Sequence, residues 1–265
     1  MGIKIYIISL KNSIRREFQI AQMGNLNLPF SFYDAVEGKC LDSEFLSSHR
    51  ADWERPMKNN EFACYLSHLR LWKIIFDNNE PALILEDDAL LSKKINKILP
   101  KLLHIQNVDY INLENRGRKK IVSKKRIAIA GNYFTRKLFH DTTGAAGYIL
   151  WPSGAKKLLR NHRKYGCALA DAKISNCYDL TRIQVDPAPI VQLDMHQIYN
   201  FLIPDKYQTA KKSSVSSSDR LITTFRQRIR RIIRQLFIGL KKIILFPFCS
   251  NRFLDSDLKY FKIDF

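Results

Sequence analysis

Compact apolar runs alternate with stretches of helical spacing along most of the chain. A short apolar run bounded by polar residues indicates a buried strand, whereas apolar residues at steps of three and four indicate a helix with one buried face. By these criteria the candidate strands are residues 3–9, 30–33, 82–85, 109–113 and 148–151, and the candidate helices are residues 14–23, 61–77 and a segment that starts at Pro152. This alternation predicts an α/β sandwich around a largely parallel sheet.

The C-terminal part carries a different pattern, a continuous apolar stripe between Asp219 and Phe246. Basic side chains occupy the remaining faces of this expected helix, Asp219 is a plausible N-cap and Pro247 should end it. The stripe could pack on the preceding domain, bind an acidic protein, or lie flat in an anionic membrane surface, which is the interpretation we favour. Its members are Ile222, Phe225, Ile229, Ile232, Leu236, Leu240 and Ile243.

Positive charge is concentrated in the same region. The 265 residues include 44 Lys and Arg against 25 Asp and Glu, a net charge of +19, and residues 206–250 hold eleven basic residues against one acid. A field of this sign favours anionic partners such as nucleotides, other phosphates, nucleic acids or acidic lipids. Because the Ser-rich segment 211–218 reads as a linker, we predict a domain at 1–210, a linker at 211–218 and a basic amphipathic tail at 219–265.

Composition excludes several classes of protein. With 46% hydrophobic and 26% charged residues the chain has a globular composition, which argues against wholesale disorder, collagen and coiled coil. Five cysteines with no CxxC pair argue against a disulfide framework or a structural zinc site. The chain shows no long uncharged apolar run and no cleavage-site pattern, so we expect a reduced protein that faces the cytosol.

Three acidic residues, Glu86, Asp87 and Asp88, directly follow the candidate strand 82–85. Ligands of open α/β sheets bind beyond the carboxyl ends of strands, and adjacent like charges repel unless a cation relieves them. A hard ion such as Mn²⁺ or Mg²⁺ would do so and could bridge a diphosphate. Since successive side chains of an extended backbone alternate, we expect Asp88 to bind the metal and Glu86 to lie beside it on the metal or the nucleotide ribose. Alternatively, the three acids cap a helix or solvate a loop.

The acidic triplet is one of a series of motifs between residues 3 and 192. The series comprises Ile5–Leu10 followed by Arg15 and Arg16, Phe32–Gly38, Glu61–His68 followed by Trp72, Leu85–Asp88, Gly144–Tyr148, Gly154–Leu159 and Pro189–Gln192. In this order the motifs resemble glycosyltransferase family 25, of the lipooligosaccharide and lipopolysaccharide galactosyltransferase type. Ser9 stands where the family usually has Asn, and Asn60 and Ala63 stand in place of two glycines.

The resemblance implies a GT-A-like, Rossmann-like nucleotide-sugar-binding domain, and it does not extend to the tail. It also implies transfer of a hexose, typically galactose from UDP-galactose, onto a lipid-linked oligosaccharide at the cytoplasmic face of the inner membrane. We expect an inverting, metal-assisted reaction that forms a β-linkage. The candidate contacts of the UDP-sugar are Ser9, Leu10, Arg15, Arg16, Glu86, Asp87 and Gly147, although the two arginines could equally lie on a solvated helix face.

An inverting transfer needs a base for the acceptor hydroxyl. Asp171 lies where the family carries an acid and is our candidate base, with Glu114 in reserve; alternatively, Asp171 caps a helix. His196 is a candidate third metal contact, unless it is an exposed histidine with no role. His68 is typical of a hydrogen-bonded core residue. The basic run 116–126 indicates a solvated mobile loop or a flap over a diphosphate.

Two other classes of function remain as alternatives. The net charge and the acidic triplet would suit a nucleic-acid-binding protein or a metal-dependent nuclease, but the basic tail lacks the interleaved aromatics of single-strand platforms, and we expect no nucleic acid partner. A non-catalytic scaffold on the membrane surface is the other alternative, and hydrolysis of a UDP-sugar would exclude it.

Overall fold

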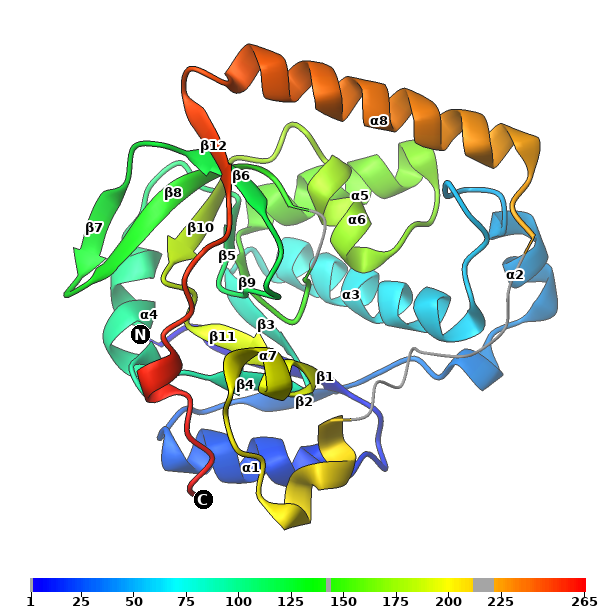
Figure 1. The fold of residues 1–265 in the computed structure, drawn as a ribbon. Coiled ribbons are helices and arrows are strands. Elements are labelled where there is room, and N and C mark those ends of the chain that lie inside the picture. Colours follow the sequence, from blue (N-terminus) through cyan, green and yellow to red (C-terminus); the bar gives the residue numbers. More distant parts are fainter. Residues whose placement is uncertain (1, 142–143, 212–221) are drawn as a thin grey trace.

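The structure, a computed structural model, describes residues 2–141, 144–211 and 222–265, and in this part of the chain a mixed ten-stranded sheet runs through the centre (Figure 1). The strands are β1 (Lys4–Ser9), β2 (Ser31–Asp34), β3 (Ala82–Glu86), β4 (Ala89–Leu91), β5 (Tyr110–Asn112), β6 (Lys120–Ser123), β7 (Ile127–Ala130), β8 (Tyr133–His140), β9 (Gly147–Leu150), β10 (Arg182–Asp186), β11 (Ile190–Gln192) and β12 (Cys249–Arg252). The α-helices are α1 (Arg15–Asn25), α2 (Ser43–His49), α3 (Asn59–Asn78), α4 (Ile95–Leu103), α5 (Pro152–Tyr165), α6 (Ala170–Asn176), α7 (His196–Tyr199) and α8 (Phe225–Leu245). Short 3₁₀ turns η1 (Gly38–Cys40), η2 (Leu193–Met195), η3 (Asp205–Lys211) and η4 (Leu258–Tyr260) join them.

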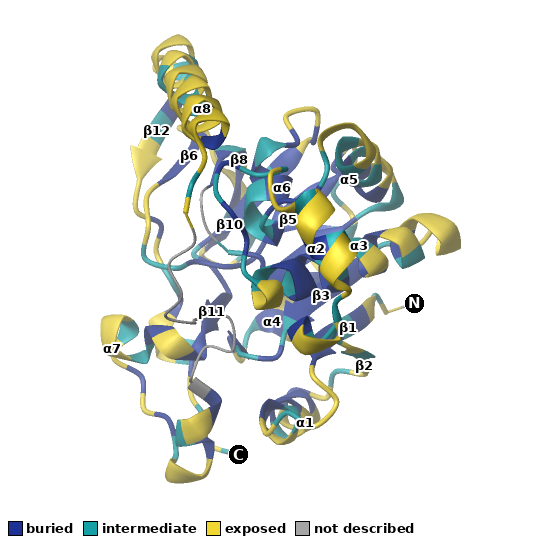
Figure 2. Ribbon diagram, turned by 90° about the vertical axis from the view of Figure 1, so that its right-hand side faces the viewer, coloured by how far each residue is buried: buried dark blue, intermediate teal, exposed yellow. Residues whose placement is uncertain are grey.

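Helices cover both faces of the sheet, and the alternation of strand side chains feeds two separate cores. In β3, Ile84 packs with the apolar faces of α3, α5 and α6, whereas Leu83 and Leu85 pack with α4 and the end of α1. All three side chains are fully buried. The uninterrupted apolar run 82–85 therefore reflects a central strand covered on both sides, as Figure 2 shows.

The sheet is mixed, so the prediction of a largely parallel sheet is wrong for much of it. The strand order is β12-β6-β8-β10-β5-β9-β3-β1-β2, with β7 paired to β8. β1 runs parallel to β2 and β3, and β5 runs parallel to β10. β9, however, is antiparallel to both β3 and β5, and β6, β7, β8 and β12 pair antiparallel as well. Apolar runs do not encode strand direction, and the short connections from β6 to β8 cannot hold crossover helices.

The basic run 116–126 is not a solvated loop throughout. Lys120 begins β6 with a side chain only 1% exposed. Its ammonium group pairs with Asp141 at 2.6 Å and donates to the carbonyl of Glu114 and to Gln184, both at 2.8 Å. A buried ammonium group with one carboxylate and two oxygen acceptors is well satisfied, which sequence alone does not reveal.

A separate two-stranded ribbon lies beside the sheet. β4 and β11 pair antiparallel, with Val191 opposite Leu90, and the Leu193 N–H donates to the Asp88 carbonyl at 3.0 Å. β4 starts directly after the acidic triplet, and β11 ends at Gln192. The ribbon therefore brings Gln192 beside the end of β3.

The C-terminal residues join the domain instead of forming a separate tail. β12 pairs with β6, and Phe261 packs in a third apolar cluster with Phe18 of α1. Residues 249–265 thus lie against residues 1–210, and the predicted boundary does not separate them. Residues 212–218 of the predicted linker lie outside the described residues.

Helix α8 begins later than predicted, at Phe225. Thr224 is its N-cap, and its side chain and that of Gln227 form a reciprocal capping box, with Gln227 N–H to Thr224 Oγ1 at 3.3 Å. Asp219, the predicted N-cap, lies outside the described residues. The helix ends at Leu245, two residues before Pro247, as the sequence predicts. Among the described helices none is long and apolar enough to cross a membrane.

Candidate functional site

A cavity of about 820 Å³ opens at the carboxyl ends of β1 and β3. Its lining comes from the end of β1 with the start of α1, the turn after β2, the first half of α3, the acidic triplet, the start of α6, and the end of β11 with η2. Arg116, Gly144, Ala145 and Thr209 complete it. Seven of the predicted site residues line it, namely Ser9, Leu10, Arg15, Glu86, Asp87, Asp88 and Asp171.

The three acids of the triplet have different surroundings because their side chains alternate. Glu86 and Asp88 point the same way, since one side-chain amide, that of Gln192, lies 3.3 Å from an oxygen of each. Asp87 points toward the start of α1. The sequence predicted this division from an extended backbone, but Asp87 and Asp88 form the turn between β3 and β4, so the turn produces it.

Asp87 is committed to holding the N-terminal strand and helix together. Its carboxylate accepts hydrogen bonds from Ser9 at 2.7 Å, from Ser13 at 3.2 Å and from Arg15 at 2.8 Å. Arg15 also donates to the backbone carbonyl of Ala210 at 2.7 Å and lies 3.6 Å from Asp88. Asp87 therefore orients the one arginine of α1 that faces the cavity.

Glu86 is the end of a hydrogen-bond relay through the core. The indole N–H of Trp72 can only donate, and it lies 2.8 Å from the Tyr148 oxygen. The Tyr148 O–H then donates to Nδ1 of His68 at 2.8 Å, which leaves the Nε2–H of His68 to donate to Glu86 at 3.1 Å. Burial alone would raise the pKa of Glu86, but this hydrogen bond and the nearby Arg116 and Arg15 hold it below its ordinary value. Glu86 is thus kept as a carboxylate.

Asp88 has the opposite electrostatic situation. Burial, followed by the negative charge of Glu86, raises the pKa of Asp88 above its ordinary value, in spite of Arg15. Its Oδ1 accepts from Gln192, whose own side-chain oxygen is buried and has no partner among the described residues. The carboxylates of Asp88 and Glu86, each 3.3 Å from the side-chain N–H group of Gln192, form a pair of hard oxygen donors of the kind that Mn²⁺ or Mg²⁺ prefers.

Asp171 lies in the first turn of α6, facing the cavity. The N-cap of the helix is Leu169, so Asp171 does not cap it in the manner the sequence allowed. Its carboxylate accepts the N–H of Ala172 at 2.6 Å, while burial raises its pKa to about 6. A carboxylate with such a pKa is ionised at neutral pH and can still accept a proton, as a general base must.

Glu114 is buried below the cavity wall, only 1% exposed. Its carboxylate accepts the Ala146 N–H at 2.9 Å, and a Cβ on Gly144, which has a φ of +96°, would lie 2.3 Å from it. Burial raises the pKa of Glu114 to about 8 although Lys120 opposes the shift. Glu114 supports the Gly144–Gly147 turn and does not itself line the cavity.

Three other predicted residues lie outside the cavity lining. Arg16 pairs with Asp34 and donates to the Ser9 carbonyl at 3.1 Å, so it ties the ends of β1 and β2 together. Gly147 is in β9, where a Cβ would approach Ile190 to 2.5 Å. His196 begins α7 with its ring against that of Phe201, at a centroid distance of 6.5 Å.

Sequence reasoning assigned no individual site role to two contributors to the cavity, although the flap alternative for the run 116–126 included Arg116. Gln192 closes the last motif of the series, but only the β4–β11 ribbon shows that it meets the acids. Arg116 comes from the basic run, lines the cavity and pairs with Asp194 at 2.5 Å. Both residues belong to a motif or a charged run that the sequence shows, but the sequence does not show which residues they contact.

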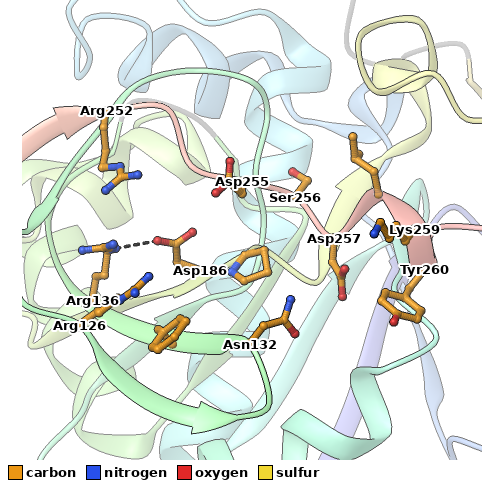
Figure 3. A pocket seen from close by; sticks show the side chains of 13 residues that line it. Arg126, Asn132, Arg136, Asp186, Arg252, Asp255, Ser256, Asp257, Lys259 and Tyr260 are labelled. Carbon is orange, nitrogen blue, oxygen red and sulfur yellow. Dashed lines mark hydrogen bonds and ion pairs between the residues drawn. The ribbon is translucent and has the colours of Figure 1, made fainter.

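A second cavity, of about 460 Å³, lies between β8, the end of β10 and the C-terminal segment (Figure 3). The ion pair between Arg136 and Asp186, 2.6 Å long and buried, lies in its wall. None of the predicted site residues lines this cavity. The first cavity is therefore the candidate site.

Comparison with known proteins gives consistent matches. The model of glycosyltransferase family 25 (LPS biosynthesis protein) matches residues 2–173. A putative glycosyltransferase of Haemophilus influenzae is 27% identical over 159 residues, which cover 58% of this chain and 56% of that protein. Human procollagen galactosyltransferase 2 is 28% identical over 171 residues, covering 59% of this chain and 27% of that protein. The match thus spans little more than half of the Haemophilus influenzae protein and about a quarter of the human protein.

A longer match is the lipooligosaccharide biosynthesis protein lic2B of Haemophilus influenzae, 26% identical over 274 residues, with 91% of this chain and 98% of that protein covered. Among solved structures, a glycosyltransferase involved in the glycosylation of the major capsid of PBCV-1 aligns with a TM-score of 0.40 and 12% identity, over 73% of this chain and 93% of that one. The structural likeness is too low to bear on function, so the sequence matches carry the comparison.

Proposed function

Because the chain belongs to glycosyltransferase family 25, we propose that it transfers galactose from UDP-galactose to a lipooligosaccharide or lipopolysaccharide acceptor, with inversion to a β-linkage. The names of the relatives support a galactosyltransferase and a role in lipooligosaccharide synthesis. The observation that carries the proposal is the cavity itself, where the carboxylates of Asp88 and Glu86 converge on the side-chain amide of Gln192 at the end of β3. A GT-A-like donor site at this edge of the sheet would place the diphosphate there.

We propose Mn²⁺ or Mg²⁺ as the cofactor, held by Asp88 with Glu86, beside the side-chain amide of Gln192. When bound, the ion supplies positive charge that stabilises the departing UDP. The protein's contribution is to keep Glu86 ionised through His68 and to hold Asp88 beside it, so that two carboxylates share one oxygen-rich corner. The raised pKa of Asp88 supports this role, because a cation would relieve the charge that burial penalises.

Asp171 is the base of the proposed reaction, and it lines the same cavity as the triplet. It would accept the proton of the acceptor hydroxyl as that oxygen attacks the anomeric carbon and the bond to UDP breaks. Arg15 and Arg116 line the same cavity and would face the diphosphate, each already oriented by an acid, Asp87 and Asp194 respectively. Arginines held in this way lose little side-chain freedom when they bind phosphate.

We propose that the acceptor is lipid-linked and that the enzyme meets it at the cytoplasmic face of the inner membrane. The net charge of +19 supports an anionic environment such as phosphorylated glycolipid. A nuclease would leave the family match unexplained. A non-catalytic scaffold with a degenerate transferase domain would share that match, and turnover of a UDP-sugar by the purified protein would exclude it.

The test is release of UDP from UDP-galactose by the purified full-length protein, with and without a truncated lipooligosaccharide, in Mn²⁺ and in EDTA. Asp88→Asn should lose activity by a factor of about a hundred or more, since a ligand of a Lewis-acid ion contributes several kcal/mol. Asp34→Asn is the matched control, because Asp34 is an acid at a strand end that does not line the cavity. Full activity in EDTA would refute the metal, and no turnover of any UDP-hexose would refute the proposed donor class.

A further inference from the structure

Helix α8 is attached to the domain with its apolar stripe facing away from it. The six stripe residues that lie in the helix are 41% to 78% exposed, from Ile229 to Phe225. Figure 1 shows α8 lying along one edge of the molecule, and Figure 2 shows it mostly in the colour of exposed residues. An amphipathic helix of a globular domain normally buries its apolar stripe. Because the stripe of α8 is exposed, the helix does not pack its stripe on the domain, which was one alternative from the sequence.

The polar side of α8 makes the contacts with the domain. Gln227 and Arg230 donate to the backbone carbonyls of Arg50 and Ala51, at 3.2 and 2.6 Å, in the segment that follows α2. Four residues further on, Arg234 pairs with Glu54 of the same segment.

The second half of the helix is attached in the same way. Lys241 donates to the carbonyl of Phe139 at 3.1 Å, and the ring of Phe237 lies 5.0 Å from that of Tyr178. Spacings of three, four and seven keep Gln227, Arg234 and Lys241 on one face, and the stripe falls on the opposite face.

The charge of α8 indicates what covers the exposed face. The helix contains seven basic residues and no acidic one. Three of the seven contact the domain, which leaves Arg226, Arg228, Arg231 and Lys242 exposed along the flanks of the stripe. A second copy of the same helix would oppose like charges. Apolar side chains flanked by cations match the interfacial region of an anionic bilayer.

Two aromatic side chains are exposed directly after the end of the helix. Phe246 and Phe248 are 74% and 70% exposed. A helix of 21 residues is about 30 Å long, so the surface is long enough to hold the domain in one orientation. We propose that α8 lies flat in the headgroup region of an anionic bilayer, with its apolar stripe toward the lipid chains and its polar face holding the domain.

Vesicle sedimentation with the full-length protein tests this surface without any donor or acceptor, so its outcome is independent of the proposed reaction. We expect the wild type to bind vesicles that contain about 30% phosphatidylglycerol, to bind pure phosphatidylcholine weakly, and to be released by high salt. Ile232→Ser with Leu236→Ser should weaken binding at least tenfold. Point variants are required because a deletion would also remove β12 from the sheet.

A matched pair of variants separates local charge from overall charge. Each basic residue near an anionic surface strengthens binding about fivefold, so Arg228→Gln with Lys242→Gln should weaken it about 25-fold. Lys97→Gln with Lys101→Gln removes the same charge from α4 and should leave binding within about twofold of wild type. Equal losses in both pairs would overturn the proposal, because binding would then depend only on net charge.

Two further results would contradict the proposal. One is absence of binding to phosphatidylglycerol vesicles by a wild type that melts cooperatively. The other is a wild-type dimer in solution that Ile232→Ser with Leu236→Ser converts to a monomer, which would assign the stripe to a second copy of the chain.

Discussion

Replacing Asp171 by Asn should inactivate the protein and stabilise it at the same time. The amide has the shape of the carboxylate, and its oxygen can still accept the Ala172 N–H. It cannot accept a proton from an acceptor hydroxyl, so we expect transfer to fall by about a hundredfold or more. Binding of UDP-galactose should change little, because the missing group acts on the acceptor.

The stability gain follows from the raised pKa of Asp171. Burial raises this pKa from 3.8 to about 6. Between these values the folded protein binds more protons than the unfolded chain, so the free energy of unfolding falls as pH rises and levels off above pH 6. The wild type loses at most about 3 kcal/mol in this way by pH 7.5, and about half of that by pH 5. Asn never ionises and avoids the loss.

Urea unfolding of both proteins at pH 5 and pH 7.5 measures the effect. The advantage of Asp171→Asn over wild type should be larger at pH 7.5 by about 1.5 kcal/mol. Initial rates of UDP release give the activity, and the kcat/KM of the wild type should fall below pH 6 as the base is protonated. An Asp171→Asn protein that is destabilised at pH 7.5 would indicate a structural aspartate, and a fully active one would remove Asp171 from the mechanism.

Three further substitutions test neighbouring parts of the site. Glu114→Gln should keep activity within a few-fold, because a carboxyl with a pKa of about 8 is already mostly protonated at neutral pH; inactivation with normal folding would make Glu114 the base. His68→Phe breaks the relay between Tyr148 and Glu86 and should lower the free energy of unfolding by about 1–3 kcal/mol. Titration with Mn²⁺ should show a weaker affinity, and an unchanged affinity would show that Glu86 needs no such partner. Gly144→Ala should lower the melting temperature and the activity together, since its φ is +96° and a Cβ would lie 2.3 Å from Glu114; a normal melting temperature would contradict that close approach.

Local features of the site could be predicted from the sequence. The strand 82–85 follows from an apolar run of four residues and is observed within β3. The helix 61–77 follows from its apolar spacing and is observed as α3, Asn59–Asn78. In each case the residues that determine the element lie within the element itself, so it can be predicted without the rest of the chain.

Features that depend on distant partners could not be predicted. Lys120 reads as one of a series of solvated cations until Asp141 and Gln184 are seen beside it. The orientation of α8 is a second example, since its spacing shows a stripe but not which face meets the domain. The antiparallel β9 is a third, because strand direction is set by the neighbours that a strand pairs with.

Gln192 and Asp88 are hydrogen-bonded but lie 104 residues apart in the chain, so the site cannot form during synthesis until Gln192 has been made. A ribosome that adds about 5–20 residues per second needs about 5–20 s to make the intervening chain. During that interval Glu86 and Asp88 have been made but β4 lacks its partner strand. A nascent chain therefore cannot complete the proposed cation site until β11 has emerged, and capture of the ion would report that the chain has folded past its midpoint.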